Sequence, residues 1–298
     1  MTVDLRIADA HQHFWDTEAN YHPWLRDEPP VPFRYGDYGA LRRPYLPDDY
    51  FRDALPHEVV RTVYVEAEWD PADPVGETRY ISRLREETGF PSVMVAQAWL
   101  DRDDCAAVLA QQSAFPFVRG IRHKPRANAS PDDGAPGGMS AARWREGFAG
   151  LARLGLRFDL QTPWWHLGEA ADLARAFPET SIILNHTGLP ADRSRGGLEG
   201  WSRAIATLAA CPNASIKISG LGQRGLPWTV GANRSIVLRA IEAFGVERSM
   251  FASNFPVDRL CASFGTIFSG FREIVADFPE ADQRKLFHDN AVRIYAME

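Results

Sequence analysis

Short runs of β-branched and other apolar residues recur along the chain, and most gaps between them mix apolar and charged residues with a helical period. The eight apolar runs predict strands. The gaps predict helices, such as 74–89, which ends at Gly89. The predicted strands are 5–10, 59–66, 92–99, 117–122, 155–161, 180–186, 214–219 and 249–254, and the other predicted helices are 140–154, 166–177, 232–245, 263–277 and 280–296.

Eight strands with helices between them in 298 residues predict an α/β protein with the (β/α)8 barrel, or TIM barrel, fold. The alternative is a doubly wound open sheet, which would carry phosphate-binding glycines after its first strand. That position holds His11-Gln12-His13, and no GxGxxG follows it. No linker rich in Pro, Gly and Ser divides the chain, so we expect one barrel domain over 1–298.

Three predicted connections, 14–50, 124–139 and 220–233, are too long to be simple turns. All three follow strands, and a barrel places such loops on the rim that carries the active site. The first loop is rich in Trp and Tyr, and the third carries Arg224. We therefore expect long rim loops that cover a substrate.

The charge pattern excludes some classes of partner. The net charge is −6 with both signs interspersed and no basic block, so nothing favours nucleic acid or an acidic membrane surface. The three cysteines lie far apart without metal-ligand spacing, which predicts reduced thiols. The sequence shows neither a secretory leader pattern nor an apolar run long enough to cross a membrane. We expect a cytoplasmic protein with a small-molecule partner, and homo-oligomerisation stays open.

The first predicted strand ends in two histidines, His11 and His13. Side chains alternate faces along a strand, so both point the same way and, in a barrel mouth, can share one metal ion or one substrate oxygen. The alternative is a pair of satisfied polar residues at a strand end. The other strands also end in polar residues, a concentration that favours a site: Glu66 or Glu68, Gln97 or Trp99, Arg122 with His123 and Lys124, Asp159 or Gln161, His186, Lys217 or Ser219, and Ser253 or Asn254.

Six segments in order along the chain carry a family resemblance: DAHQHFW, VEAEW, GIRHKP, ILNHTG, FASNFPVD and FHDNAVRIY. Together they resemble the amidohydrolase superfamily, in the lactonase branch that includes L-fuconolactonases, 4-sulfomuconolactone hydrolases and 2-pyrone-4,6-dicarboxylate lactonases. The resemblance covers essentially the whole chain. It implies a (β/α)8 barrel that opens a small sugar-acid or aromatic-pathway lactone by attack of water on a polarised carbonyl.

The resemblance also implies roles for single residues. His11 and His13 match the pair that binds a divalent metal in most relatives or polarises the carbonyl in metal-free ones. His186 matches a histidine that polarises the lactone carbonyl, and Arg122 one that grips substrate carboxylate or hydroxyl groups. The further substrate-binding candidates are Glu66, Lys124, Trp15, Trp24 and Arg224.

Two departures from the family pattern matter for the mechanism. Strand five runs into Gln161 without the histidine of binuclear relatives, so a two-metal centre is not expected. Asn254 stands where strand eight usually carries an aspartate, and an amide cannot act as a carboxylate base.

Three explanations of this departure stay open. Asp258 can reach back as the base, its alternative role being the cap of a helix over 259–277. One Zn²⁺ held by His11, His13, Glu66 and His186 can instead acidify a bound water. Otherwise hydrolysis has been lost.

Two other functions compete with lactone hydrolysis. A metal-dependent decarboxylase or hydratase on the same barrel would use the same histidines, and CO₂ release from an aromatic acid would identify it. A non-catalytic sugar-acid binding protein would be stabilised by lactones without turning them over. A serine-nucleophile route is disfavoured because no Gly-x-Ser-x-Gly elbow occurs.

Overall fold

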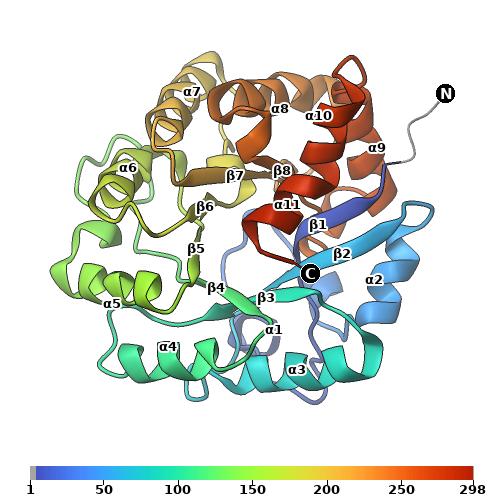
Figure 1. The fold of residues 1–298 in the computed structure, drawn as a ribbon. Helices are drawn as coiled ribbons and strands as arrows, with labels where there is room; N and C mark the ends of the chain where they lie inside the picture. Colours follow the sequence, from blue (N-terminus) through green and yellow to red (C-terminus); the bar gives the residue numbers. More distant parts are fainter. Residues whose placement is uncertain (1–4, 298) are drawn as a thin grey trace.

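The computed structural model describes residues 5–297, and the fold of this part confirms the predicted (β/α)8 barrel (Figure 1). Parallel strands succeed one another in chain order round a single eight-stranded sheet. The barrel closes through the backbone after the last strand, where Asn254 N donates to His11 O and His13 N donates to Phe255 O, both at 2.8 Å. The strands are β1 Ile7–Gln12, β2 Val59–Val65, β3 Val93–Gln97, β4 Val118–Arg122, β5 Arg157–Leu160, β6 Ile182–Leu184, β7 Ala214–Ile218 and β8 Ser249–Phe251.

Helices surround the sheet and close one end of it (Figure 1). The predicted helix over 280–296 is present as an unbroken helical run, in which a π-helical segment, Lys285–Asp289, joins α10 to α11. No helix within residues 5–297 has the length and apolarity needed to span a bilayer. The helices are α1 Pro23–Arg26, α2 Pro47–Ala54, α3 Gly76–Thr88, α4 Cys105–Ser113, α5 Ala142–Arg153, α6 Leu167–Ala176, α7 Arg195–Ala209, α8 Val230–Phe244, α9 Phe264–Ile274, α10 Glu280–Arg284 and α11 Asn290–Ile294.

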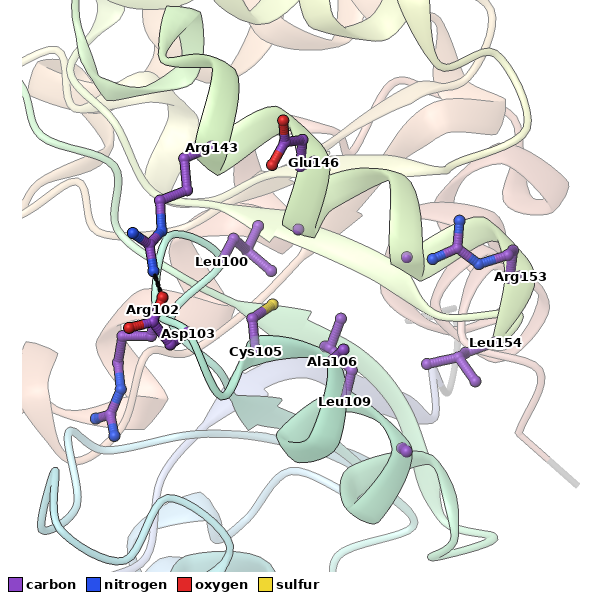
Figure 2. A pocket seen from close by; sticks show the side chains of 13 residues that line it. Leu100, Arg102, Asp103, Cys105, Ala106, Leu109, Arg143, Glu146, Arg153 and Leu154 are labelled. Carbon is purple, nitrogen blue, oxygen red and sulfur yellow. Dashed lines mark hydrogen bonds and ion pairs between the residues drawn. The ribbon is translucent and has the colours of Figure 1, made fainter.

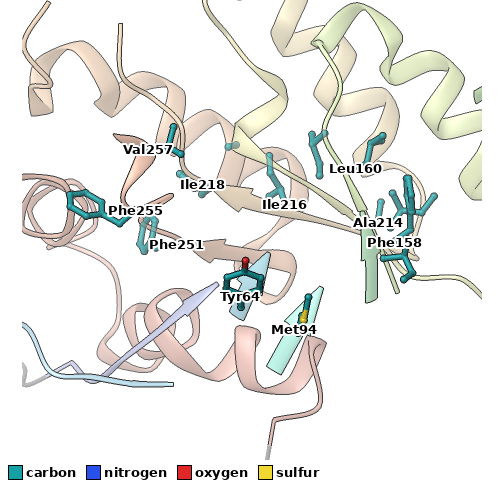
Figure 3. Packing of buried hydrophobic residues seen from close by; sticks show 14 of the residues in the cluster. Tyr64, Met94, Phe158, Leu160, Ala214, Ile216, Ile218, Phe251, Phe255 and Val257 are labelled. Atoms are coloured by element: carbon teal, nitrogen blue, oxygen red, sulfur yellow. The ribbon is translucent and has the colours of Figure 1, made fainter. Parts of the chain in front are cut away.

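Two hydrophobic clusters lie on the two faces of the strands, one on the outer face and one on the inner face. Alternate residues such as Phe158, Ile216 and Ile218 pack outward against the helices (Figure 3). The intervening positions face the barrel interior, where the apolar ones form a smaller cluster with Ala291 of α11 and with Tyr295, the residue that follows this helix. This alternation makes the rim of the barrel the place where inward polar side chains meet.

A β-bulge in β1 determines where the two histidines point. Ala8 and Ala10 belong to the inner cluster, so simple alternation would turn His11 outward. The β1–β2 register shifts between Asp9 and Gln12, which adds one residue on the β1 side. His11 therefore turns inward with His13, and the two imidazoles meet as predicted.

Candidate active site

A cavity of about 370 Å³ lies at the carboxyl ends of the strands, the end that carries the active site in such barrels. It is large enough for a small lactone with a few substituents. Another cavity, of about 610 Å³, lies between α4 and α5 outside the barrel, beside the Arg143–Asp103 ion pair (Figure 2). No strand-end histidine lines that outer cavity, so we place the candidate site at the barrel mouth.

Backbone strain is concentrated around the mouth cavity. Glu68, His186, Leu189 and Asn254 all line it, and their φ angles lie between 52° and 57°. This left-handed conformation costs a non-glycine residue about 1–3 kcal/mol and persists where the surroundings impose it, characteristically at functional sites. The strain therefore supports the same location as the cavity and the strand ends.

Hydrogen bonds fix the orientation of the histidines. His13 Nδ1 lies 2.7 Å from Val65 O, and a carbonyl only accepts, so the hydrogen of neutral His13 is on Nδ1 and its Nε2 carries a lone pair. His11 Nε2 lies 3.2 Å from His13 Nε2 and donates a hydrogen bond to its lone pair. His186 Nδ1 contacts Ser219 Oγ at 3.1 Å, which leaves its Nε2 without a hydrogen-bond partner within residues 5–297.

The electrostatic environment keeps these imidazoles neutral. Burial lowers the pKa of His11, His13 and His186 well below the usual range, and nearby cations, Arg122 among them, lower each pKa further. Two hydrogen bonds oppose this effect at His13, one to Val65 O and one to the Asn254 side chain. Each ring can therefore accept a proton or donate its N–H at neutral pH.

Asp258 lies directly behind the cavity and is held by three side chains, a group that we call the Asp258 clamp. Its Oδ1 accepts hydrogen bonds from Asn254 Nδ2 at 2.6 Å and Tyr35 Oη at 3.0 Å, and lies 3.6 Å from Arg34 Nη2. Burial raises the pKa of Asp258, which is only 2% exposed. Because Asn254 gives its N–H to this carboxylate, its carbonyl oxygen is left for His13.

The alternative of Asp258 as a helix cap is wrong. The side chain of Ser263 caps α9 by accepting a hydrogen bond from Thr266 N. The carboxylate of Asp258 instead orients the residue that replaces the usual strand-eight aspartate.

The cations that line the mouth are paired with carboxylates. Arg122 forms an ion pair with Glu66 through Nε and donates from Nη2 to the Glu66 carbonyl and from Nη1 to Gln161 Oε1 at 3.2 Å. Lys124 forms an ion pair with Glu68, whose backbone N–H donates to Glu66 Oε2 at 2.7 Å. The mouth therefore presents alternating donors and acceptors rather than an uncompensated positive field.

The predicted site residues fall into three groups. His13, His186, Asn254, Arg122, Lys124, Trp15 and Trp24 line the cavity, whereas His11, Glu66 and Asp258 contact that lining from behind. Arg224 lies elsewhere, because its guanidinium packs behind the first rim loop against Gly36 and lines a separate cavity of about 480 Å³. Seven other lining residues were not among the predicted site residues: Val31, Pro32, Phe33, Arg34, Ala67, Leu189 and Val257. Only the aromatic content of the 14–50 loop gave any sign of the four that belong to that loop.

The side chains do not fit the predicted zinc site. His11 and His13 have the spacing of two zinc ligands, since a tetrahedral site places nitrogens about 3.3 Å apart. However, Arg122 holds the Glu66 carboxylate, and His11 Nδ1 lacks the hydrogen-bond acceptor that a metal-bound histidine uses. Within residues 5–297 no three His, Cys, Asp or Glu side chains are arranged to hold a metal ion.

A (β/α)8 barrel with inward histidines and ion-paired arginines round a cavity at the carboxyl ends of its strands is the arrangement of a TIM-barrel enzyme. The chain belongs to the amidohydrolase family, whose model matches residues 8–297. The family resemblance of the six sequence segments is thereby confirmed.

Individual relatives extend this comparison. An uncharacterized protein of Sinorhizobium fredii is 41% identical, over 98% of this chain and 99% of its own. An L-fucono-1,5-lactonase of Burkholderia ambifaria is 30% identical, over 86% of this chain and 82% of its own. Two crystal structures of a Burkholderia multivorans amidohydrolase, one with bound HEPES and one with bound zinc, have TM-scores of 0.81, cover 98% of this chain and 99% of that chain, and are 25% and 24% identical.

Proposed function

We propose that this amidohydrolase hydrolyses a neutral sugar lactone, one without a further carboxylate, by adding water to the lactone carbonyl. The observation that carries the proposal is the arrangement of His13, His186 and Asn254 at one cavity, each with a defined hydrogen-bond partner behind it. The lactonase named among the relatives supports the same reaction class.

His186 serves as the electrophile in this mechanism. Its Nδ1 is engaged by Ser219, and its Nε2–H donates to the carbonyl oxygen of the lactone. A neutral imidazole suits this task, because it stabilises the oxyanion that forms when water attacks without protonating the substrate beforehand. Gly220 makes room for the ring, since a Cβ at that position would lie 2.7 Å from His186 Cβ.

His13 serves as the general base. Its Nε2 lone pair accepts from His11 Nε2–H in the structure, and it takes a proton from the attacking water when that water replaces His11 as the donor. Both N–H groups of the resulting imidazolium are satisfied, one by Val65 O and the other by the Asn254 carbonyl. When the tetrahedral intermediate collapses, the ring C–O bond breaks and the departing oxygen takes this proton.

Asn254 replaces a carboxylate without acting as a base in this scheme. The Asp258 clamp fixes its amide, whose Nδ2 donates to Asp258 and whose carbonyl oxygen accepts from His13 Nε2 once that nitrogen has taken the proton. Asp258 itself lies behind the lining, so we assign it to positioning. Lactones are activated relative to amides, and one electrophile with one base in fixed positions supplies most of the acceleration required.

The mouth fits a neutral polyhydroxylated ring better than an anion. A substrate carboxylate would have to displace Glu66 from Arg122 or Glu68 from Lys124, whereas hydroxyl groups can bridge these donors and acceptors. Trp24 and Phe33, stacked with ring centroids 5.8 Å apart, supply an apolar wall for the carbon face of a sugar ring.

The test is hydrolysis of a panel of sugar 1,4- and 1,5-lactones and muconolactone-type acids, followed with a pH indicator before and after chelation. We expect sugar lactones to be turned over after chelation, and His186→Asn to lower kcat/KM by at least ~100-fold through loss of one preorganised electrophile. His288→Asn is the control, because that half-exposed histidine pairs with Asp289 away from the cavity.

Three results would contradict the proposal. Activity restored only by Zn²⁺ would make the first-strand histidines metal ligands. Release of CO₂ from an aromatic acid without lactone turnover would identify a decarboxylase. Heat stabilisation by lactones without turnover would identify a binding protein.

A further inference from the structure

A second polar cavity, of about 400 Å³, lies at the opposite end of the barrel from the candidate active site. Figure 1 shows this end, which α11 crosses. The cavity lies where β5, β6 and β7 begin, and α11 borders it. The polar residues that matter are Arg157, Ser181, Ser215, Arg248 and Arg293, and we call this site the arginine cavity.

The three arginines of this cavity carry uncompensated charge. None of them makes an ion pair with a carboxylate within residues 5–297, in contrast to Arg122 at the active site. They are held by neutral acceptors: Arg248 Nη1 donates to Ala214 O at 3.0 Å, and Arg293 Nη2 donates to Asn290 Oδ1 at 3.1 Å.

Free donors remain on each guanidinium after these contacts. Arg157 uses Nε and Nη1, Arg248 uses Nη1 and Nη2, and Arg293 uses Nη2 alone. Glu179 is the single acidic residue of the lining, and its exposed side chain pairs with none of the three. Arg157 and Arg248 are partly withdrawn from water, whereas Arg293 is exposed. Unpaired cations that are partly withdrawn from water favour a bound anion.

A buried hydroxyl points to the same ligand chemistry. Ser215 is only 7% exposed and lines the cavity, yet its hydroxyl has no hydrogen-bond partner within residues 5–297. Its neighbours Ala214 and Ile216 belong to the outer cluster, so the Ser215 side chain faces inward. A nearly buried donor that lines the same cavity as arginines without counterions suits the oxygen atoms of an anion.

We propose that the arginine cavity binds a small oxyanion carrying two or more negative charges, either a phosphate group or a di- or tricarboxylate. Arg157, Arg248 and Arg293 supply the charge, and Ser215 donates one hydrogen bond. Barrel enzymes use this end for stability rather than catalysis, so the ligand acts on the fold and not on the reaction. The proposal does not depend on the substrate of the candidate active site.

The test measures binding to the full-length protein by calorimetry and by the midpoint of thermal unfolding. Inorganic phosphate and citrate are titrated separately, with sodium chloride at matched ionic strength as the blank. We expect one saturable site for at least one of the two anions and a higher Tm with that anion. Binding of phosphate alone assigns the phosphate class, and binding of citrate alone assigns the carboxylate class.

Matched variants locate the site. Arg293→Gln should weaken binding at least tenfold, and Ser215→Ala, which leaves all charges in place, should weaken it about threefold. Arg119→Gln is the control, because Arg119 donates to Ala296 O at the same end of the barrel but lines a different cavity. His186→Asn should bind the anion as the parent protein does.

Four results would overturn the proposal: a shift in Tm no larger than that of sodium chloride, full binding by both the Arg293 and Ser215 variants, equal loss in the Arg119 variant, or loss of binding in His186→Asn. If Arg293→Gln does not fold, the comparison of Ser215→Ala with Arg119→Gln still decides the outcome.

Discussion

Replacing Gly220 by alanine tests how closely the position of His186 controls turnover. Gly220 has φ +64°, and an added Cβ would lie 2.7 Å from His186 Cβ, where ordinary contacts begin at 3.4 Å. Relieving this overlap requires a shift of about 0.7 Å. A displacement of 1 Å in a catalytic group costs up to about 100-fold in rate, so we expect kcat/KM to fall roughly 30-fold.

Gly225 provides the matched control for this substitution. It has φ +69° in the same rim loop, but an added Cβ would meet nothing within 4 Å. Gly220→Ala and Gly225→Ala should both lose roughly 1–2 kcal/mol of stability from the left-handed backbone, measured by thermal unfolding. Only Gly220→Ala should lose lactone turnover in the pH-indicator assay. Equal turnover by the two variants would refute the assigned role of His186.

Two further predictions concern charge at the site. Asp258→Asn replaces a charge-assisted hydrogen bond worth about 1.5–3 kcal/mol, so kcat/KM should fall roughly 10- to 100-fold with an unchanged pH profile; disappearance of the acid limb would make Asp258 the general base. The lowered pKa values of His11, His13 and His186 mean that the unfolded chain binds more protons below about pH 6.5. The free energy of unfolding should therefore have its full value above that pH and decrease below it, by up to about 4 kcal/mol per pH unit. A free energy of unfolding from denaturant titrations that does not change down to pH 5 would contradict this.

The sequence predicted the parts of the fold and site that depend on local pattern. The apolar runs and helical periods lie within single elements, so the eight strands could be placed from composition and period alone. The inward orientation of His11 and His13 at the end of β1 was also predicted, but the prediction relied on the alternation of side chains along a strand. That alternation alone would turn His11 outward. The bulge between Asp9 and Gln12, which turns His11 inward, left no mark in the sequence.

The contacts that hold the candidate catalytic groups could not be predicted, because they join distant segments. Tyr35 meets Asp258 across 223 positions of the chain. The pairing of Glu66 with Arg122, which removes Glu66 from any metal site, likewise depends on the relative heights of β2 and β4. Arg224 was placed wrongly at the substrate cavity. Its position in a rim loop does not show whether its long side chain packs toward that cavity or, as the structure has it, behind the 14–50 loop.

The Asp258 clamp joins the two ends of the barrel sequence. Arg34 and Tyr35 belong to the loop after the first strand, and Asn254 and Asp258 follow the last one. The loop that we expect to enclose the substrate is thus also part of the scaffold of His13, the proposed general base. Exchanging this loop between relatives to change substrate preference would alter the proton-transfer machinery at the same time, so the two properties are expected to evolve together.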